Sequence, residues 1–174
     1  NNTDAAWEVV YDSLNGVIPD TGNAMIAFDG TRGAMSRIFP RQLDFSGTSQ
    51  PVLEFWYYHD TAATAGMNDY TDVRLTFDGG ETFTTLFSVR KNNGNDVGWR
   101  QYTYPLDSFV NQSCVILVFE AMRMSMPTFD GIQYIDRIKL TSNQDLAVSA
   151  IHTSELSACD YTGKELQIVL GSLT

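Results

Sequence analysis

The chain has 174 residues, 43% of them hydrophobic and 18% charged, and it carries a formal net charge of −10. This composition excludes a disordered chain and indicates one globular domain with room for part of another. The acidic excess argues against a nucleic-acid partner, because a phosphate backbone would be repelled. No apolar run approaches the roughly 18 residues of a membrane span, so no membrane-spanning segment is predicted.

Short apolar or alternating segments, separated by Gly, Asn, Asp and Pro, predict a chain that is almost entirely β. One helical turn is expected near residues 105–110. Because no helix connects the strands, the predicted architecture is an antiparallel sandwich of two sheets. The expected strands cover residues 7–11, 24–28, 34–39, 52–58, 72–77, 83–89, 99–104, 114–121 and 132–140.

The segment FWYYHD places four aromatic rings in a row. Successive side chains of a strand point to opposite faces. The pattern therefore assigns Leu53, Phe55 and Tyr57 to the core. Trp56 and Tyr58 then lie on the outer face, where two interpretations stay open. Either a linker covers these two rings, or they form a platform for a protein or glycan ligand.

The segment LTFDGGETF predicts a hairpin whose turn contains Asp78, Gly79 and Gly80, where a positive φ is needed. The spacing of Thr76, Asp78 and Gly80, followed by Thr82, resembles an Asp-box hairpin. In such a hairpin the aspartate accepts hydrogen bonds from turn amides. The expected role of Asp78 is therefore structural.

The sequence gives little support to catalysis. Its two histidines are His59 and His152, and Asp60 cannot orient His59 because adjacent strand residues point apart. It contains no nucleophile-elbow, phosphate-binding or zinc-binding motif. Cys114 is expected in the core, and both it and Cys159 are expected to be free thiols in different structural units. The domain is therefore predicted not to be an enzyme.

The segment GIQYIDRIKL contains a carboxylate in an unusual position. Alternation places Asp136 on a face whose other residues are apolar, namely Ile132, Tyr134, Ile138 and Leu140. A buried carboxylate is costly unless a cation, hydrogen-bond donors or a bulge accommodates it. Two alternatives stay open: a calcium ion, which prefers carboxylate and carbonyl oxygens, or a carboxylate that caps backbone amides.

The composition changes after Leu140, where the polar segment TSNQ is followed by the strand candidates DLAVSAIH and ELQIVL. Two strands are marginally stable alone. The sequence thus predicts a first domain over 1–141, a linker over 142–145 and the truncated start of a second β-domain over 146–174. The alternative is that these strands join the first sandwich, since sequential strands usually stay adjacent.

Seven segments resemble, by their joint order, the MAM-type jelly roll and in particular the cleaved-adhesin domains of bacterial surface proteins. They are GNAMIAFDG, GAMSRIFPRQLDF, VLEFWYYHD, DVRLTFDGGETFTTL, GWRQYTYPL, CVILVFEA and IQYIDRIKL. The resemblance covers about residues 7–141 and implies an antiparallel jelly-roll β-sandwich of the MAM-like or galactose-binding-like kind. The cysteine pattern of animal MAM domains is absent, which favours the bacterial branch. The tail is similar to the start of an immunoglobulin-like module.

This resemblance implies a non-catalytic adhesion or protein-binding module of a secreted or cell-surface bacterial protein. A carbohydrate-binding module, or an accessory domain of a secreted peptidase, is the alternative. The implied partner is an extracellular protein or a glycan. The resemblance also implies a structural calcium ion held by Asp136, with Asp20 as a second ligand by position. Arg137 stands where the family's closing motif has a second acid. A calcium site here would therefore have fewer carboxylate ligands than the family pattern implies.

Overall fold

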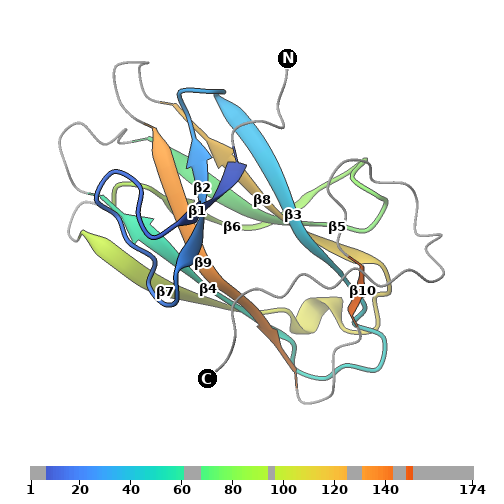
Figure 1. Ribbon diagram of the computed structural model, residues 1–174. Helices are drawn as coiled ribbons and strands as arrows, with labels where there is room; N and C mark the ends of the chain where they lie inside the picture. Colours follow the sequence, from blue (N-terminus) through green and yellow to red (C-terminus); the bar gives the residue numbers. More distant parts are fainter. Residues whose placement is uncertain (1–6, 61–67, 94–96, 125–130, 143–147, 151–174) are drawn as a thin grey trace.

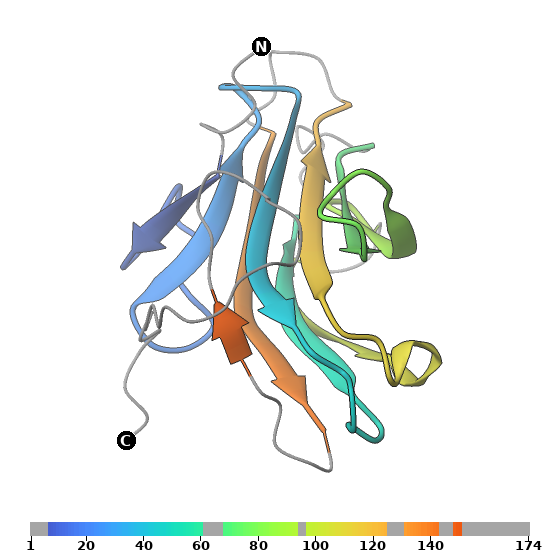
Figure 2. The ribbon, with the colours of Figure 1, turned by 90° about the vertical axis from the view of Figure 1, so that its right-hand side faces the viewer.

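The chain forms two antiparallel sheets that pack face to face, as the computed structural model shows (Figures 1 and 2). The structure describes residues 7–60, 68–93, 97–124, 131–142 and 148–150. Its elements are β1 (Trp7–Tyr11), β2 (Ala24–Asp29), β3 (Met35–Leu43), β4 (Val52–His59), β5 (Tyr70–Thr76), β6 (Thr84–Arg90), β7 (Gly98–Pro105), η1 (Asp107–Phe109), β8 (Val115–Met122), β9 (Ile132–Thr141) and β10 (Val148–Ala150).

The strand order confirms the predicted all-β jelly-roll sandwich. The first sheet has the order β1-β2-β9-β4-β7, and the second has the order β10-β3-β8-β5-β6. Among the described strands, β1 with β2 and β5 with β6 are the consecutive pairs that stay within a sheet, and the other connections pass between sheets. The expected helical turn is present as η1. No described helix has the length and apolar character needed to cross a membrane.

The core lies between the two sheets, and strand β4 shows why. Leu53, Phe55 and Tyr57 are fully buried, as alternation predicted. The Phe55 ring packs edge-on against Phe119 of β8 and stacks on Tyr102 of β7, with ring centroids 5.2 and 5.5 Å apart. A core residue of the first sheet therefore contacts the second sheet directly.

The hairpin between β5 and β6 is held by Asp78, in the predicted structural role. Its Oδ1 accepts hydrogen bonds from the Thr76 hydroxyl at 2.7 Å and the Thr82 amide at 2.9 Å. Gly79 and Gly80 have φ values of 72° and 99°. The hydrogen bonds from Thr82, and then from Thr76, hold the pKa of Asp78 below its ordinary value. The carboxylate therefore contributes stability that is lost as the pH falls through this lowered pKa.

Strand β9 contains an extra residue that decides where Asp136 points. Its pairing with β4 shifts between Glu54, opposite Lys139, and Trp56, opposite Asp136, and Arg137 has a φ of 52°. One extra residue on one strand is a β-bulge, which reverses the alternation of faces beyond it.

The bulge divides the apolar stripe that alternation predicted. Ile138 and Leu140 pack against the core between the sheets, whereas Ile132 and Tyr134 belong to a second cluster on the outer side of the first sheet. Asp136 lies on that outer side, where it meets the loop between β1 and β2. The prediction that all five residues share one face is wrong, because it assumed strict alternation along the whole strand.

The expectation of free thiols is also wrong. Cys114 is half-exposed just before β8 and is disulfide-bonded. The only other cysteine of the chain is Cys159, which lies outside the described residues. The sequence argument failed because it placed Cys114 in the apolar core as an inert thiol, whereas the residue lies half-exposed at the start of β8.

Residues 148–150 form the short strand β10, which pairs with the end of β3. Val148 lies opposite Leu43, and Ala150 lies opposite Gln42. This pairing corresponds to the alternative in which the tail adds to the first sandwich. The division into 1–141, 142–145 and 146–174, and the immunoglobulin-like character of the tail, stay predictions, since residues 151–174 lie outside the described part.

Candidate functional site

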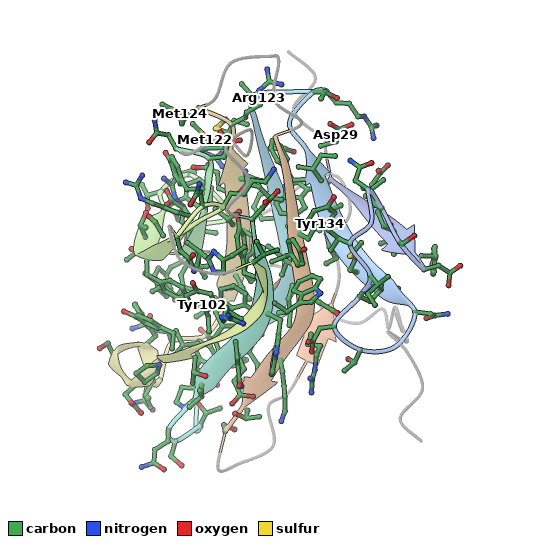
Figure 3. The ribbon with its side chains drawn as sticks, turned by 90° about the vertical axis from the view of Figure 1, so that its left-hand side faces the viewer. Asp29, Tyr102, Met122, Arg123, Met124 and Tyr134 are labelled. Carbon is green, nitrogen blue, oxygen red and sulfur yellow. The ribbon has the colours of Figure 1, made fainter. Side chains whose placement is uncertain are left out.

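The loop between β1 and β2, residues 12–23, lies across part of the outer face of the first sheet (Figure 1). Val17 of this loop joins a buried cluster with Met25, Ala27, Ile132 and Tyr134. Figure 3 shows the labelled Tyr134 on β9, beside β2. The outer side of β2 and β9 is therefore a second, smaller core rather than a solvated surface.

Side chains of the sheet hold the backbone of this loop. The Trp99 Nε1 donates a hydrogen bond to the Ile18 carbonyl at 2.9 Å, and the Tyr134 hydroxyl donates to the Leu14 carbonyl at 3.2 Å. Both donors come from strands of the first sheet. The loop is thus fixed against β7 and β9, and its position is set by the sheet.

Asp136 provides the third attachment of the loop. Its Oδ2 accepts hydrogen bonds from the backbone amides of Asp20 at 2.8 Å and Thr21 at 3.3 Å, and its Oδ1 accepts one from the Arg137 amide at 2.7 Å. Asp20 in turn pairs with Arg137, with Oδ2 and Nη1 3.0 Å apart. The structure therefore brings the two predicted metal ligands together. It uses Asp136 as a cap for backbone amides, which was the alternative to calcium.

Burial raises the pKa of Asp136, and the three backbone donors lower it part of the way back. Because the folded-state pKa lies above the ordinary value, the ionised carboxylate costs stability at neutral pH. That stability is recovered as the pH falls through the raised pKa. A cation bound beside Asp136 would relieve the same cost.

Calcium stays a prediction at this site. Within the described residues, no group of three or more His, Cys, Asp or Glu side chains is placed to hold a metal ion. Arg137 already supplies a positive group to Asp20. A calcium ion shared by Asp20 and Asp136 would have to displace that guanidinium or use loop carbonyls beside it.

Chelation tests the calcium prediction directly. If calcium bridges Asp136 and the loop, EGTA is expected to lower the melting temperature, since a ligand at a hundred times its Kd stabilises the fold by about 2.7 kcal/mol. The melting temperature of the Asp136→Asn variant should not change in EGTA. For the unchanged protein, added magnesium should not restore the melting temperature that EGTA lowers. An unchanged melting curve in EGTA would leave the amide cap as the whole role of Asp136.

The two outer rings of β4 have different surroundings, and both are half-buried. The Arg137 guanidinium lies 4.2 Å over the centroid of the Trp56 ring. Tyr58 packs edge-on against Trp99 and Tyr134, with centroids 5.5 and 5.8 Å apart. Rings of β7 and β9 thus cover part of Tyr58, which packs against the cluster that contains Val17 of the loop, and an arginine caps one side of Trp56. The ligand platform at Trp56 and Tyr58 remains a prediction.

Three further residues adjoin these rings and were not singled out from the sequence as part of a platform. Gln101 lies opposite Trp56 and Trp99 lies opposite Tyr58 in the pairing of β4 with β7, and Arg137 stacks on Trp56. We call these five residues the outer aromatic face. The alternation of β7 indicates which of its side chains point outward, but only the register shows which rings they meet.

His59 is a core residue in this structure. It is fully buried, and its Nε2 lies 2.8 Å from the Tyr102 hydroxyl. The ring centroids of His59 and Tyr57 are 5.3 Å apart. His152 lies outside the described residues.

The described residues thus form an all-β jelly-roll domain whose clustered Trp, Tyr and Arg side chains lie on a sheet face. No family model matches the chain, and no curated protein sequence matches it. Solved structures to which this chain is similar include the K2 cleaved adhesin domain of Lys-gingipain. It is 13% identical over 80% of this chain and 91% of that chain, with a TM-score of 0.48.

Two carbohydrate-binding domains are similar to the same degree. Domain CBM27-1 of Caldicellulosiruptor saccharolyticus, solved with mannohexaose, is 13% identical over 78% of this chain and 82% of that chain, with a TM-score of 0.46. The xylan-binding domain CBM22-2 from Paenibacillus barcinonensis is 13% identical over 79% of this chain and 86% of that chain, with a TM-score of 0.43. At these identities and TM-scores the likeness assigns no function to this chain.

Proposed function

We propose that this domain is a non-catalytic adhesion module of a secreted or cell-surface bacterial protein, and that it binds an extracellular protein through the outer aromatic face. The observation that carries the proposal is the stacking of Arg137 on Trp56 beside Tyr58 and Trp99. Trp, Tyr and Arg dominate the binding energy of protein interfaces. Here they stand together on paired strands rather than on a loop.

The side chain of Arg137 is oriented over Trp56 before any partner binds. Asp20 orients the Arg137 guanidinium, and the Arg137 backbone amide donates to Asp136. A side chain that is already oriented loses less conformational entropy on binding. The bulge at Arg137 therefore supports the proposal by placing a fixed cation over a fixed ring.

The disulfide at Cys114 supports the extracellular part of the proposal. Disulfides persist in secreted and cell-surface proteins and are rare in reducing compartments. The bacterial origin rests on the resemblance of the sequence segments to cleaved-adhesin domains.

A glycan is the second candidate ligand, because hydrogen-bonding side chains flank the Trp56 ring. Gln101 lies opposite Trp56 and Thr103 lies opposite Glu54 on neighbouring strands. A sugar that stacks on the ring face capped by Arg137 would have to displace the guanidinium. Arg137→Ala should therefore strengthen glycan binding and weaken protein binding, which separates the two candidates.

Trp56→Ala is the direct test of the binding face. We expect it to weaken binding by about 1–3 kcal/mol, because the ring and the orientation of Arg137 are lost together. Binding to immobilised extracellular proteins and to a glycan array would be measured by surface plasmon resonance. Tyr11→Ala is the matched control, since Tyr11 is an aromatic residue of the same sheet that is 65% exposed. A ligand set that binds both variants equally well would overturn the proposal.

A further inference from the structure

Each sheet has two outermost strands, and three of these four edges carry features that hinder pairing with another chain. Strand β1 has only 5 residues, and its Glu8 pairs with Arg32. Strand β6 has a register irregularity in its pairing with β5. Strand β10 has 3 residues, and the part of β3 beyond it contains Pro40 and another irregularity.

The fourth edge, strand β7, has none of these features. It pairs with β4 through eight successive residues without a shift, from Gly98 to Pro105. Its only proline is the last residue, and its only charged residue is Arg100. Among the described strands, β4 is its one partner. A long, regular edge presents a row of backbone donors and acceptors to an incoming strand.

The inner side of β7 offers side-chain contacts to such a strand. Tyr102 and Tyr104 stack on Phe87 of β6, with ring centroids 6.3 and 5.0 Å apart. All three rings are half-buried where β6 and β7 end the two sheets. Figure 3 shows the labelled Tyr102 on β7. An added strand would place alternate side chains beside these ring edges.

Charge indicates the kind of segment that fits. Strands β6 and β7 contain Arg90 and Arg100 and no acidic residue, although the chain has 21 acidic against 11 basic residues. Both arginines are exposed. The charged side chains of these two strands are therefore all positive, and an acidic segment would meet the opposite charge there.

We propose that β7 is a docking edge for an extended, acid-bearing peptide segment of a partner protein, which adds to the first sheet as a further strand. Main-chain hydrogen bonds would supply affinity, and the aromatic ring edges and Arg100 would supply selectivity. The docking edge is the backbone side of β7 that faces away from β4, whereas the outer aromatic face, which includes Trp99 and Gln101 of the same strand, consists of side chains on the outer surface of the sheet.

The test is selection of a displayed library of random linear peptides on the full chain. We expect enriched peptides to alternate apolar and polar residues and to carry at least one acid. Resynthesised peptides with N-methyl groups at every second residue should lose binding for one of the two methylated sets only, since alternate amides of an edge strand face its neighbour. Arg100→Glu should weaken binding several-fold, and Arg90→Glu should weaken it less, since Arg90 lies on β6 in the other sheet.

Trp56→Ala should leave peptide binding intact, so failure of the proposed function and failure of this docking edge can be told apart. The proposal is overturned if no peptide is enriched, or if enriched peptides tolerate both methylated sets or Arg100→Glu. It is equally overturned if sedimentation shows that the chain dimerises and that Arg100→Glu abolishes the dimer. That result would assign the edge to a second copy.

Discussion

Replacing Phe55 with alanine is expected to lower the free energy of unfolding by about 3–5 kcal/mol. The ring is fully buried and contacts Phe119, Tyr102 and Phe87, so its removal leaves a cavity lined by rings from both sheets. The remaining rings lie on three other strands, β6, β7 and β8, and cannot collapse into that space without moving those strands. Urea denaturation followed by circular dichroism measures the change, with the m-value expected to stay constant.

The neighbouring residue provides the control for this experiment. Trp56 is of similar size but half-buried on the opposite face of β4. Trp56→Ala should therefore cost about 1 kcal/mol of stability, through lost packing and the lost contact with Arg137. If the two variants were destabilised equally, the assignment of core and outer faces to β4 would be incorrect.

Gln133→Leu is expected to lower the free energy of unfolding by about 2–4 kcal/mol, because it leaves two buried hydroxyls without their acceptor. Tyr57 Oη and Thr71 Oγ1 donate to Gln133 Oε1 at 2.7 and 2.8 Å. Gln133 Nε2 donates in turn to the Met122 carbonyl at 3.1 Å. Burial raises the pKa of Tyr57, so its hydroxyl stays protonated and remains a donor in alkaline solution.

A combined variant distinguishes loss of hydrogen bonds from a change of shape. Adding Tyr57→Phe and Thr71→Val to Gln133→Leu removes the donors together with their acceptor. Replacing all partners of a buried polar group by apolar ones is often nearly neutral. We therefore expect the triple variant to recover most of the stability. If it were less stable than Gln133→Leu, packing around Gln133 would be the main cause.

Sequence alternation was sufficient wherever a strand is regular. It placed Leu53, Phe55 and Tyr57 in the core, and it found the hairpin at Asp78 because turn geometry depends on local residues. Both features involve neighbours within a few positions. The local sequence therefore determines both the alternation of faces and the turn, independently of how distant segments pair.

The closing strand shows where this method stops. The bulge at Arg137 depends on how β9 pairs with β4, and no residue type in the segment predicts it. Without the bulge, Asp136 could not be assigned to the outer side, and the cap it forms on the loop amides could not be foreseen. The same holds for Trp99, whose contact with Tyr58 follows from register. Pairing between distant segments is set by the whole fold.

The disulfide at Cys114 changes how the domain would carry a mechanical load. Strands β1 and β10 are the first and last described strands, and each lies at the edge of a sheet. Tension applied to these two strands would separate them from their sheets one at a time. Cys114 directly precedes β8, the central strand of the second sheet. Tension passed through the disulfide of Cys114 would enter at that central strand. It would then have to shear β8 from neighbours on both sides, which protects the domain against stepwise extraction.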